Sequence, residues 1–96
     1  MARYRIVHWN EIPSVVEAFD GDAVVRLPLS QRFQDLIDAV AMKEGATETD
    51  AYLEGWAQGP ELDRAGSPST VAQAVAAEIE ERFSDLVAKA FGARRE

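Results

Sequence analysis

Few side chains in this sequence are of the types that perform catalysis or bind metal ions. His8 is the single histidine, and an imidazole is the usual general acid or base near neutral pH. Asp35 and Asp38 are spaced by about one helical turn, so their carboxylates could offer two oxygen ligands to a hard cation. The chain contains no cysteine, which excludes thiolate zinc sites, cysteine nucleophiles and disulfides.

Structural interpretations account for each of these groups. No carboxylate partner for His8 is identifiable, and its place in a strand pattern predicts an inward-facing core residue. Two aspartates are too few for a metal site, so a solvated helix face explains them. The hydroxyls of Ser67, Ser69 and Thr70 adjoin a proline and suit the start of a helix better than a nucleophile or phosphate site. We therefore expect no catalytic residue, no metal and no cofactor.

Composition and charge describe one small acidic domain spanning residues 1–96. Ten basic and seventeen acidic side chains give a net charge of −7. This balance argues against general binding to a nucleic acid backbone or to anionic lipid, because both need clustered Lys and Arg. No segment approaches the ~18 apolar residues of a membrane span, and we expect a cytoplasmic protein.

Four segments have the composition of strands. Arg3 to Trp9 is the first, and an Asp20-Gly21 turn predicts a hairpin of Ser14 to Phe19 with Asp22 to Leu27. Ala51 to Ala57, interrupted by Gly55, is read as a fourth strand with a bulge or a close backbone approach.

Two apolar stripes predict helices. The first helix follows the N-cap residue Ser30, and Gly45 is expected to end it. The second follows Ser67-Pro68 and continues to Ala90 as one long helix. The order β-β-β-α-β-α predicts an α+β fold with a four-stranded, mainly antiparallel sheet and two helices packed on one face.

The Asp20-Gly21 loop fixes a register that pairs Phe19 with Asp22 and so sorts the hairpin side chains onto two faces. The apolar face, which we expect to meet the helices, carries Val16, Ala18, Ala23, Val25 and Leu27. The mixed face carries Val15, Glu17, Phe19, Asp22, Val24 and Arg26.

Extension of the pattern to the other strands places Tyr4, Ile6 and His8 inward and adds aromatic and charged residues to the mixed face. Exposed aromatic side chains beside arginine are typical of binding interfaces. The predicted binding surface comprises Arg3, Arg5, Trp9, Phe19, Arg26, Tyr52, Glu54 and Trp56.

Several strings resemble those of the small bacterial "virulence factor" domain family. They are RYRIVHWNEIPSVVE, LSQRFQDLIDAVAM, AYLEGW and the ERF of the last helix, and together they span roughly residues 2–86. The family occurs as a short stand-alone protein and within the larger conserved virulence factor C proteins, beside NifU-like and HEAT-repeat segments. Its name records a phenotype, so the resemblance transfers no catalytic residue.

These observations favour a non-enzymatic accessory domain that binds a protein partner, either itself or another subunit, through the mixed face. A homodimer that buries Trp9, Phe19, Tyr52 and Trp56 is the expected form. The alternative is a small-molecule-binding or enzyme-associated protein that holds a flat anionic ligand with the same residues. An RNA-binding sheet is the third possibility, and the charge of −7 disfavours it.

Overall fold

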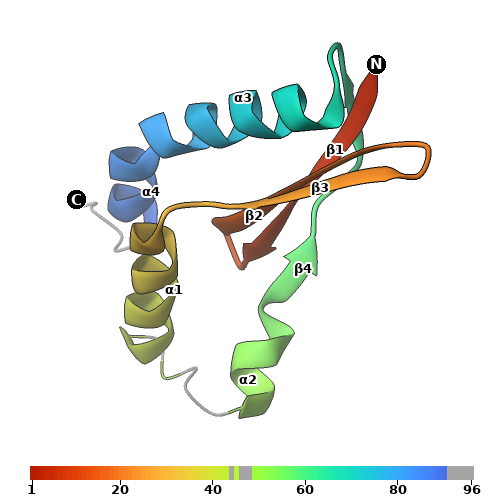
Figure 1. The fold of residues 1–96 in the computed structure, drawn as a ribbon. Coiled ribbons are helices and arrows are strands. Elements are labelled where there is room, and N and C mark those ends of the chain that lie inside the picture. Colours follow the sequence, from red (N-terminus) through yellow and green to blue (C-terminus); the bar gives the residue numbers. More distant parts are fainter. Residues whose placement is uncertain (44, 46–48, 91–96) are drawn as a thin grey trace.

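The computed structural model describes residues 1–43, 45 and 49–90 of the chain. It is an α+β domain with an antiparallel sheet and four helices among these residues (Figure 1). The strands are β1 (Ala2–Trp9), β2 (Ile12–Asp20), β3 (Ala23–Pro28), β4 (Trp56–Gln58) and β5 (Leu62–Arg64). The helices are α1 (Gln31–Lys43), α2 (Thr49–Glu54), α3 (Pro68–Glu81) and α4 (Phe83–Ala90).

The sheet is built around β1, which pairs with β2 along one edge and with two short strands along the other. β4 pairs with the carboxyl end of β1 and β5 with its amino end. Pro60, which lacks an N–H group, lies between these two short strands. The sequence predicted four strands, and β5 is an additional one.

The hairpin turn lies one residue further along the chain than predicted. Asp20 pairs with Ala23, so the loop is Gly21-Asp22 rather than Asp20-Gly21. Gly21 has a φ of +60° while Asp22 does not have a positive φ, which is the pattern of a type II′ turn.

The register correction leaves the two predicted faces intact. Val16 pairs with Leu27 instead of Val25, a slip of two residues, and a slip of two returns every side chain to its original face. Val16 and Ala18 on the apolar face are fully buried, whereas Val24 on the mixed face is 66% exposed.

Helix α3 crosses the apolar face of the sheet, while α1 and α4 lie together beyond the end at which β1 turns into β2 (Figure 1). Ser67 caps α3 as predicted, since its hydroxyl accepts a hydrogen bond from the Thr70 N–H at 3.2 Å. The long helix expected from residue 68 to residue 90 is divided at Arg82 into α3 and α4.

The largest error concerns the Ala51 to Ala57 segment, which was predicted to be a strand. Residues up to Glu54 form helix α2, and only Trp56–Gln58 is a strand. Gly55 separates the two elements, and its N–H donates to the Tyr52 carbonyl at 3.2 Å. Aromatic composition favours strands, but here a tertiary contact overrides that preference, because the helical turn places Tyr52 against Trp9.

Candidate functional site

The structure removes Trp9 from the predicted binding surface. Trp9 is 0% exposed, and its ring stacks on Tyr52 with centroids 5.8 Å apart. The indole Nε1 donates a hydrogen bond to the Tyr52 carbonyl at 2.7 Å. The expectation that Trp9 lies on an open face, available to a partner, is therefore wrong, because α2 folds over this end of the sheet.

Tyr52 and Trp56 are half-buried members of the same aromatic cluster. Their rings meet edge to face with centroids 6.0 Å apart. The Tyr52 hydroxyl also accepts a hydrogen bond from Gln34 of α1 at 3.3 Å. Glu54 ends α2 and is exposed. The predicted aromatic surface is thus largely an internal packing unit.

The remaining predicted residues lie together on the open part of the mixed face, where their charges pair with one another. Glu17 lies between Arg5, at 2.8 Å, and Arg26, and its side chain is only 10% exposed. Arg5 also lies over the Phe19 ring, with its guanidinium carbon 5.5 Å from the centroid.

Arg3 continues the same network at the amino end of β1. It contacts Glu61 at 3.5 Å and Asp63 at 3.4 Å. Three arginines thus face three carboxylates across this surface, so little positive charge is left to hold an anionic ligand.

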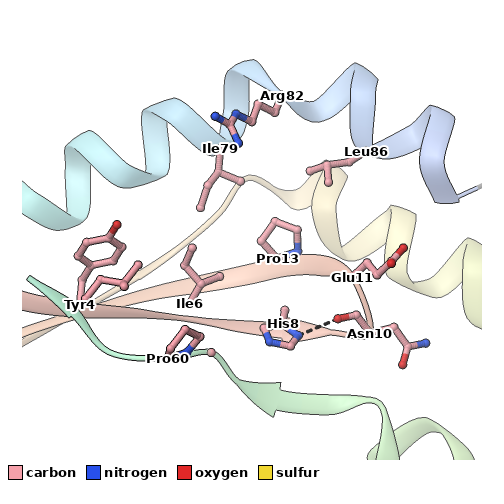
Figure 2. A pocket seen from close by; sticks show the side chains of 12 residues that line it. Tyr4, Ile6, His8, Asn10, Glu11, Pro13, Pro60, Ile79, Arg82 and Leu86 are labelled. Carbon is pink, nitrogen blue, oxygen red and sulfur yellow. Dashed lines mark hydrogen bonds between the residues drawn. The ribbon is translucent and has the colours of Figure 1, made fainter.

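A pocket of about 390 Å³ lies on the opposite, helix-covered side of the sheet. We call it the β1–α3 pocket. Figure 2 shows side chains from β1, the β1–β2 turn, the segment after β4 and the α3–α4 helices converging on it. Its lining residues are Tyr4, Ile6, His8, Asn10, Glu11, Pro13, Gly59, Pro60, Leu62, Ile79, Arg82 and Leu86. Most of this lining is apolar, as is typical of ligand pockets.

His8 is the polar side chain that β1 contributes to the pocket, on the same side as Tyr4 and Ile6, as the sequence predicted. Its Nδ1 atom lies 2.7 Å from the carbonyl oxygen of Asn10 (Figure 2). Because a carbonyl can only accept, Nδ1 carries the proton, and Nε2 is the acceptor of the neutral ring. The Nε2 edge faces Gly59, where an added methyl group would come within 3.9 Å of it.

Arg82 contributes a positive charge from the α3–α4 junction. Its guanidinium interacts electrostatically with Glu78, one helical turn earlier on α3, where it helps to hold the pKa of that carboxyl below its ordinary value. A second cavity of about 500 Å³ adjoins the first and shares Asn10, Glu11 and Leu86 with it. Lys89 lines this second cavity.

Sequence reasoning identified His8 and the inward positions of β1 but missed the rest of the pocket. Pro13, Pro60 and the pair Ile79 and Arg82 come from three segments with no shared motif. The one sequence feature that pointed to the pocket was the apolar stripe of the last predicted helix. Its residue Leu86 lies beside the β1–β2 turn in the pocket wall.

The comparisons with known proteins give one match. The family model described as "Virulence factor" matches residues 7–89. The chain belongs to the virulence factor family. No curated protein and no solved structure matches it.

The sequence elements that carried the resemblance have structural roles in this virulence factor domain. The Trp-x-x-Ile-Pro and Glu-Gly-Trp elements meet where Trp9 packs on Gly55, and the Asn10 N–H donates to the Gly55 carbonyl at 2.8 Å. The Arg-Phe element joins helices, because Arg32 binds Glu80 of α3 at 2.9 Å and lies 4.4 Å from the Phe83 ring centroid.

The described residues of the virulence factor domain provide neither a membrane span nor a metal site. None of its helices there has the length and apolar content to cross a bilayer. Within the same residues, no three His, Asp or Glu side chains are grouped in a way that could hold a metal ion.

Proposed function

We propose that this domain is a non-enzymatic binding protein whose site is the β1–α3 pocket, and that its ligand is a small amphipathic anion. The observation that carries the proposal is the pocket itself, about 390 Å³ of mainly apolar lining with His8 and Arg82 among its walls. Sites for small molecules span ~300–1,000 Å³ and combine an apolar lining with a few polar groups. A small-molecule-binding protein was the alternative that the sequence suggested, but the proposed site lies on the helix-covered face of the sheet and not on the mixed face.

The charges around the pocket support an anionic ligand. Arg82 lines the pocket, whereas Glu78, with which it interacts, does not, and Lys89 lies in the adjoining cavity. Glu11 is the carboxylate that lines both cavities. These groups give the rim of the two cavities a net positive charge. Because the chain as a whole carries −7, an anion would be attracted to this rim and repelled elsewhere.

Binding, rather than catalysis, fits the surroundings of His8. Its ring hydrogen-bonds to a backbone carbonyl and, among the described residues, to no carboxylate of the kind that orients the histidine of a Ser-His-Asp triad. We also propose that the domain acts in the cytoplasm, because a chain without cysteine suits a reducing compartment.

Titration with 8-anilinonaphthalene-1-sulfonate, an amphipathic anion that fluoresces in apolar sites, tests the proposal, with decanoate as the competitor. Leu62→Trp places a large ring at the mouth of the pocket, and Leu62 is 47% exposed, so the core is not disturbed. We expect this variant, and Arg82→Gln, each to bind the probe about tenfold more weakly, equivalent to roughly 1.4 kcal/mol.

Arg3→Gln is the matched control, because Arg3 lies on the other face of the sheet and its side chain is 64% exposed. It should bind the probe like the parent chain. Probe binding that Leu62→Trp leaves unchanged, or no saturable binding by the parent chain, would overturn the proposed site.

A further inference from the structure

The free edge of β3 is the longest unpaired strand edge of the sheet. β3 pairs with β2 on one side and contacts α3 on one face, and no other described strand pairs with it. Exposed edges are normally blocked by proline, lysine, a bulge or a covering segment. β3 carries two features of this kind, the charged Arg26 and Pro28 at its end, and no described segment covers the edge from Ala23 to Leu27.

The two-residue Gly21-Asp22 loop determines which backbone groups face outward. In such a hairpin Asp20 and Ala23 form a hydrogen-bonded pair, and bonded and non-bonded pairs then alternate. At the other end of the hairpin the Leu29 N–H donates to the Ser14 carbonyl at 2.9 Å. Ser14 and Leu29 are therefore a bonded pair, as this alternation requires. The N–H and C=O groups of Val24 and Arg26 therefore point away from β2.

The side chains along this edge would complement those of the same edge in a second copy of the chain. An antiparallel second copy centred on Val24 would place Val24 against Val24. It would also place Asp22, in the loop just before β3, against Arg26 of the other copy. A pairing centred on Arg26 would instead oppose two arginines and bring Val24 against Pro28, which has no N–H group to donate. A pairing centred on Asp22 would oppose two aspartates.

The exposure of these residues suits such a contact. Val24 is 66% exposed, an unusual position for a large apolar side chain. Arg26 contacts Glu17 through Nη1, and its side chain is 61% exposed, which leaves other guanidinium N–H groups free to bind a second carboxylate.

We infer that two copies of this chain associate through their β3 strands, antiparallel and centred on Val24, to form one continuous sheet. The inference is independent of the proposed ligand site, because the β1–α3 pocket is lined by no residue of β3. It replaces the homodimer expected through the aromatic residues, since Trp9 is enclosed within its own chain.

Light scattering after size-exclusion chromatography, from 1 to 500 μM chain, measures the association. The parent chain should approach twice its mass of 10.6 kDa as the concentration rises. Val24→Lys would place two ammonium groups opposite each other at the centre of the interface. This variant should remain a monomer over the whole concentration range. Met42→Lys is the matched control, because Met42 is 73% exposed on α1, away from β3.

A single cysteine then tests the register, since the chain has none of its own. In Val24→Cys, the two-fold axis would bring the paired Cα atoms about 5.5 Å apart, within the range of a disulfide. Mild oxidation should therefore yield a covalent dimer from Val24→Cys and not from Met42→Cys. A parent chain that is monomeric at 500 μM, or a dimer that Val24→Lys leaves unchanged, would overturn the inference.

Discussion

At the residue scale, tight packing joins the two tryptophan-containing motifs. A Cβ atom at Gly55 would lie 2.4 Å from Trp9 Nε1, far inside van der Waals contact. Gly55 is therefore required by its neighbour rather than by its backbone conformation. The indole in turn donates to the Tyr52 carbonyl, so the end of α2 is fixed to β1 through one side chain.

Gly55→Ala should destabilise the domain by about 2–3 kcal/mol, because the added methyl group displaces a fully buried indole. Chemical denaturation followed by tryptophan fluorescence measures this change. Gly45→Ala is the comparison: it meets no atom within 4 Å, and its cost comes only from a φ of +73°. Equal losses in the two variants would contradict the packing explanation.

Glu17 illustrates how the mixed face holds a buried charge. It lies directly opposite Arg26 in the hairpin and beside Arg5 of β1, so a single carboxylate links three strands.

Glu17→Ala should lower the free energy of unfolding by about 1–3 kcal/mol, since two guanidinium groups lose their partner while Arg26 keeps access to water. Urea denaturation measures the loss. Asp20→Ala, an exposed acidic position of the same hairpin, should change stability much less. A neutral effect of Glu17→Ala would show that the network contributes nothing.

At the element scale, Glu80 connects the start of α1 to the end of α3. Its carboxylate accepts hydrogen bonds from the Ser30 N–H and the Ser30 hydroxyl, each at 2.8 Å, and from Arg32. Ser30 therefore begins α1 as predicted, but its hydroxyl donates to another helix instead of capping its own. Partial burial raises the pKa of Glu80, but these hydrogen bonds outweigh that effect and hold it below its ordinary value.

The lowered pKa predicts a stability difference that depends on pH. The carboxylate stabilises the fold above its unfolded pKa, near 4.5, and this contribution is lost as the pH falls through the lower folded pKa. Glu80→Gln should therefore be less stable than the parent chain by about 1 kcal/mol at pH 7. The difference should shrink below pH 4.5. Thermal denaturation from pH 3 to 7 checks this, and a difference that does not vary with pH would contradict it.

At the scale of the whole molecule, the stable part of the domain is the β1–β2–α3 layer. Val16 and Ala18 of β2 are 0% exposed, as is Ala72 of α3. β4, β5 and β3 lie at the sheet edges, and β4 and β5 have three residues each. The proposed ligand site lies between β1 and α3 of this layer, and the proposed dimer edge lies at its margin.

Hydrogen exchange should reflect that arrangement. The amides of Val15 and Glu17, which the strand alternation turns toward the central strand β1, are expected to exchange most slowly, because they exchange only when the whole domain unfolds. Amides of β4 and β5 should exchange through local opening, at least tenfold faster. Exchange monitored by NMR at pH 7 measures both sets, and uniform rates over all five strands would contradict this picture.

The sequence by itself determined the features that depend on local periodicity. The two hairpin faces, the apolar stripe and both ends of α1, and the Ser67 cap follow from alternation, helical spacing and capping chemistry. Even the misplaced turn preserved the faces, because the error was a slip of two residues.

Only the tertiary structure decided the features that depend on contacts between distant segments. Residues 51–54 are helical because Tyr52 packs on Trp9, 43 residues away in the sequence, and no local pattern encodes that contact. The division at Arg82 has no glycine or proline to mark it, and Phe83 is held by its edge-to-face contact with Phe33 at 5.0 Å. The pocket likewise exists only where four separate segments meet, so the candidate site moved from the face that the sequence favoured to the opposite one.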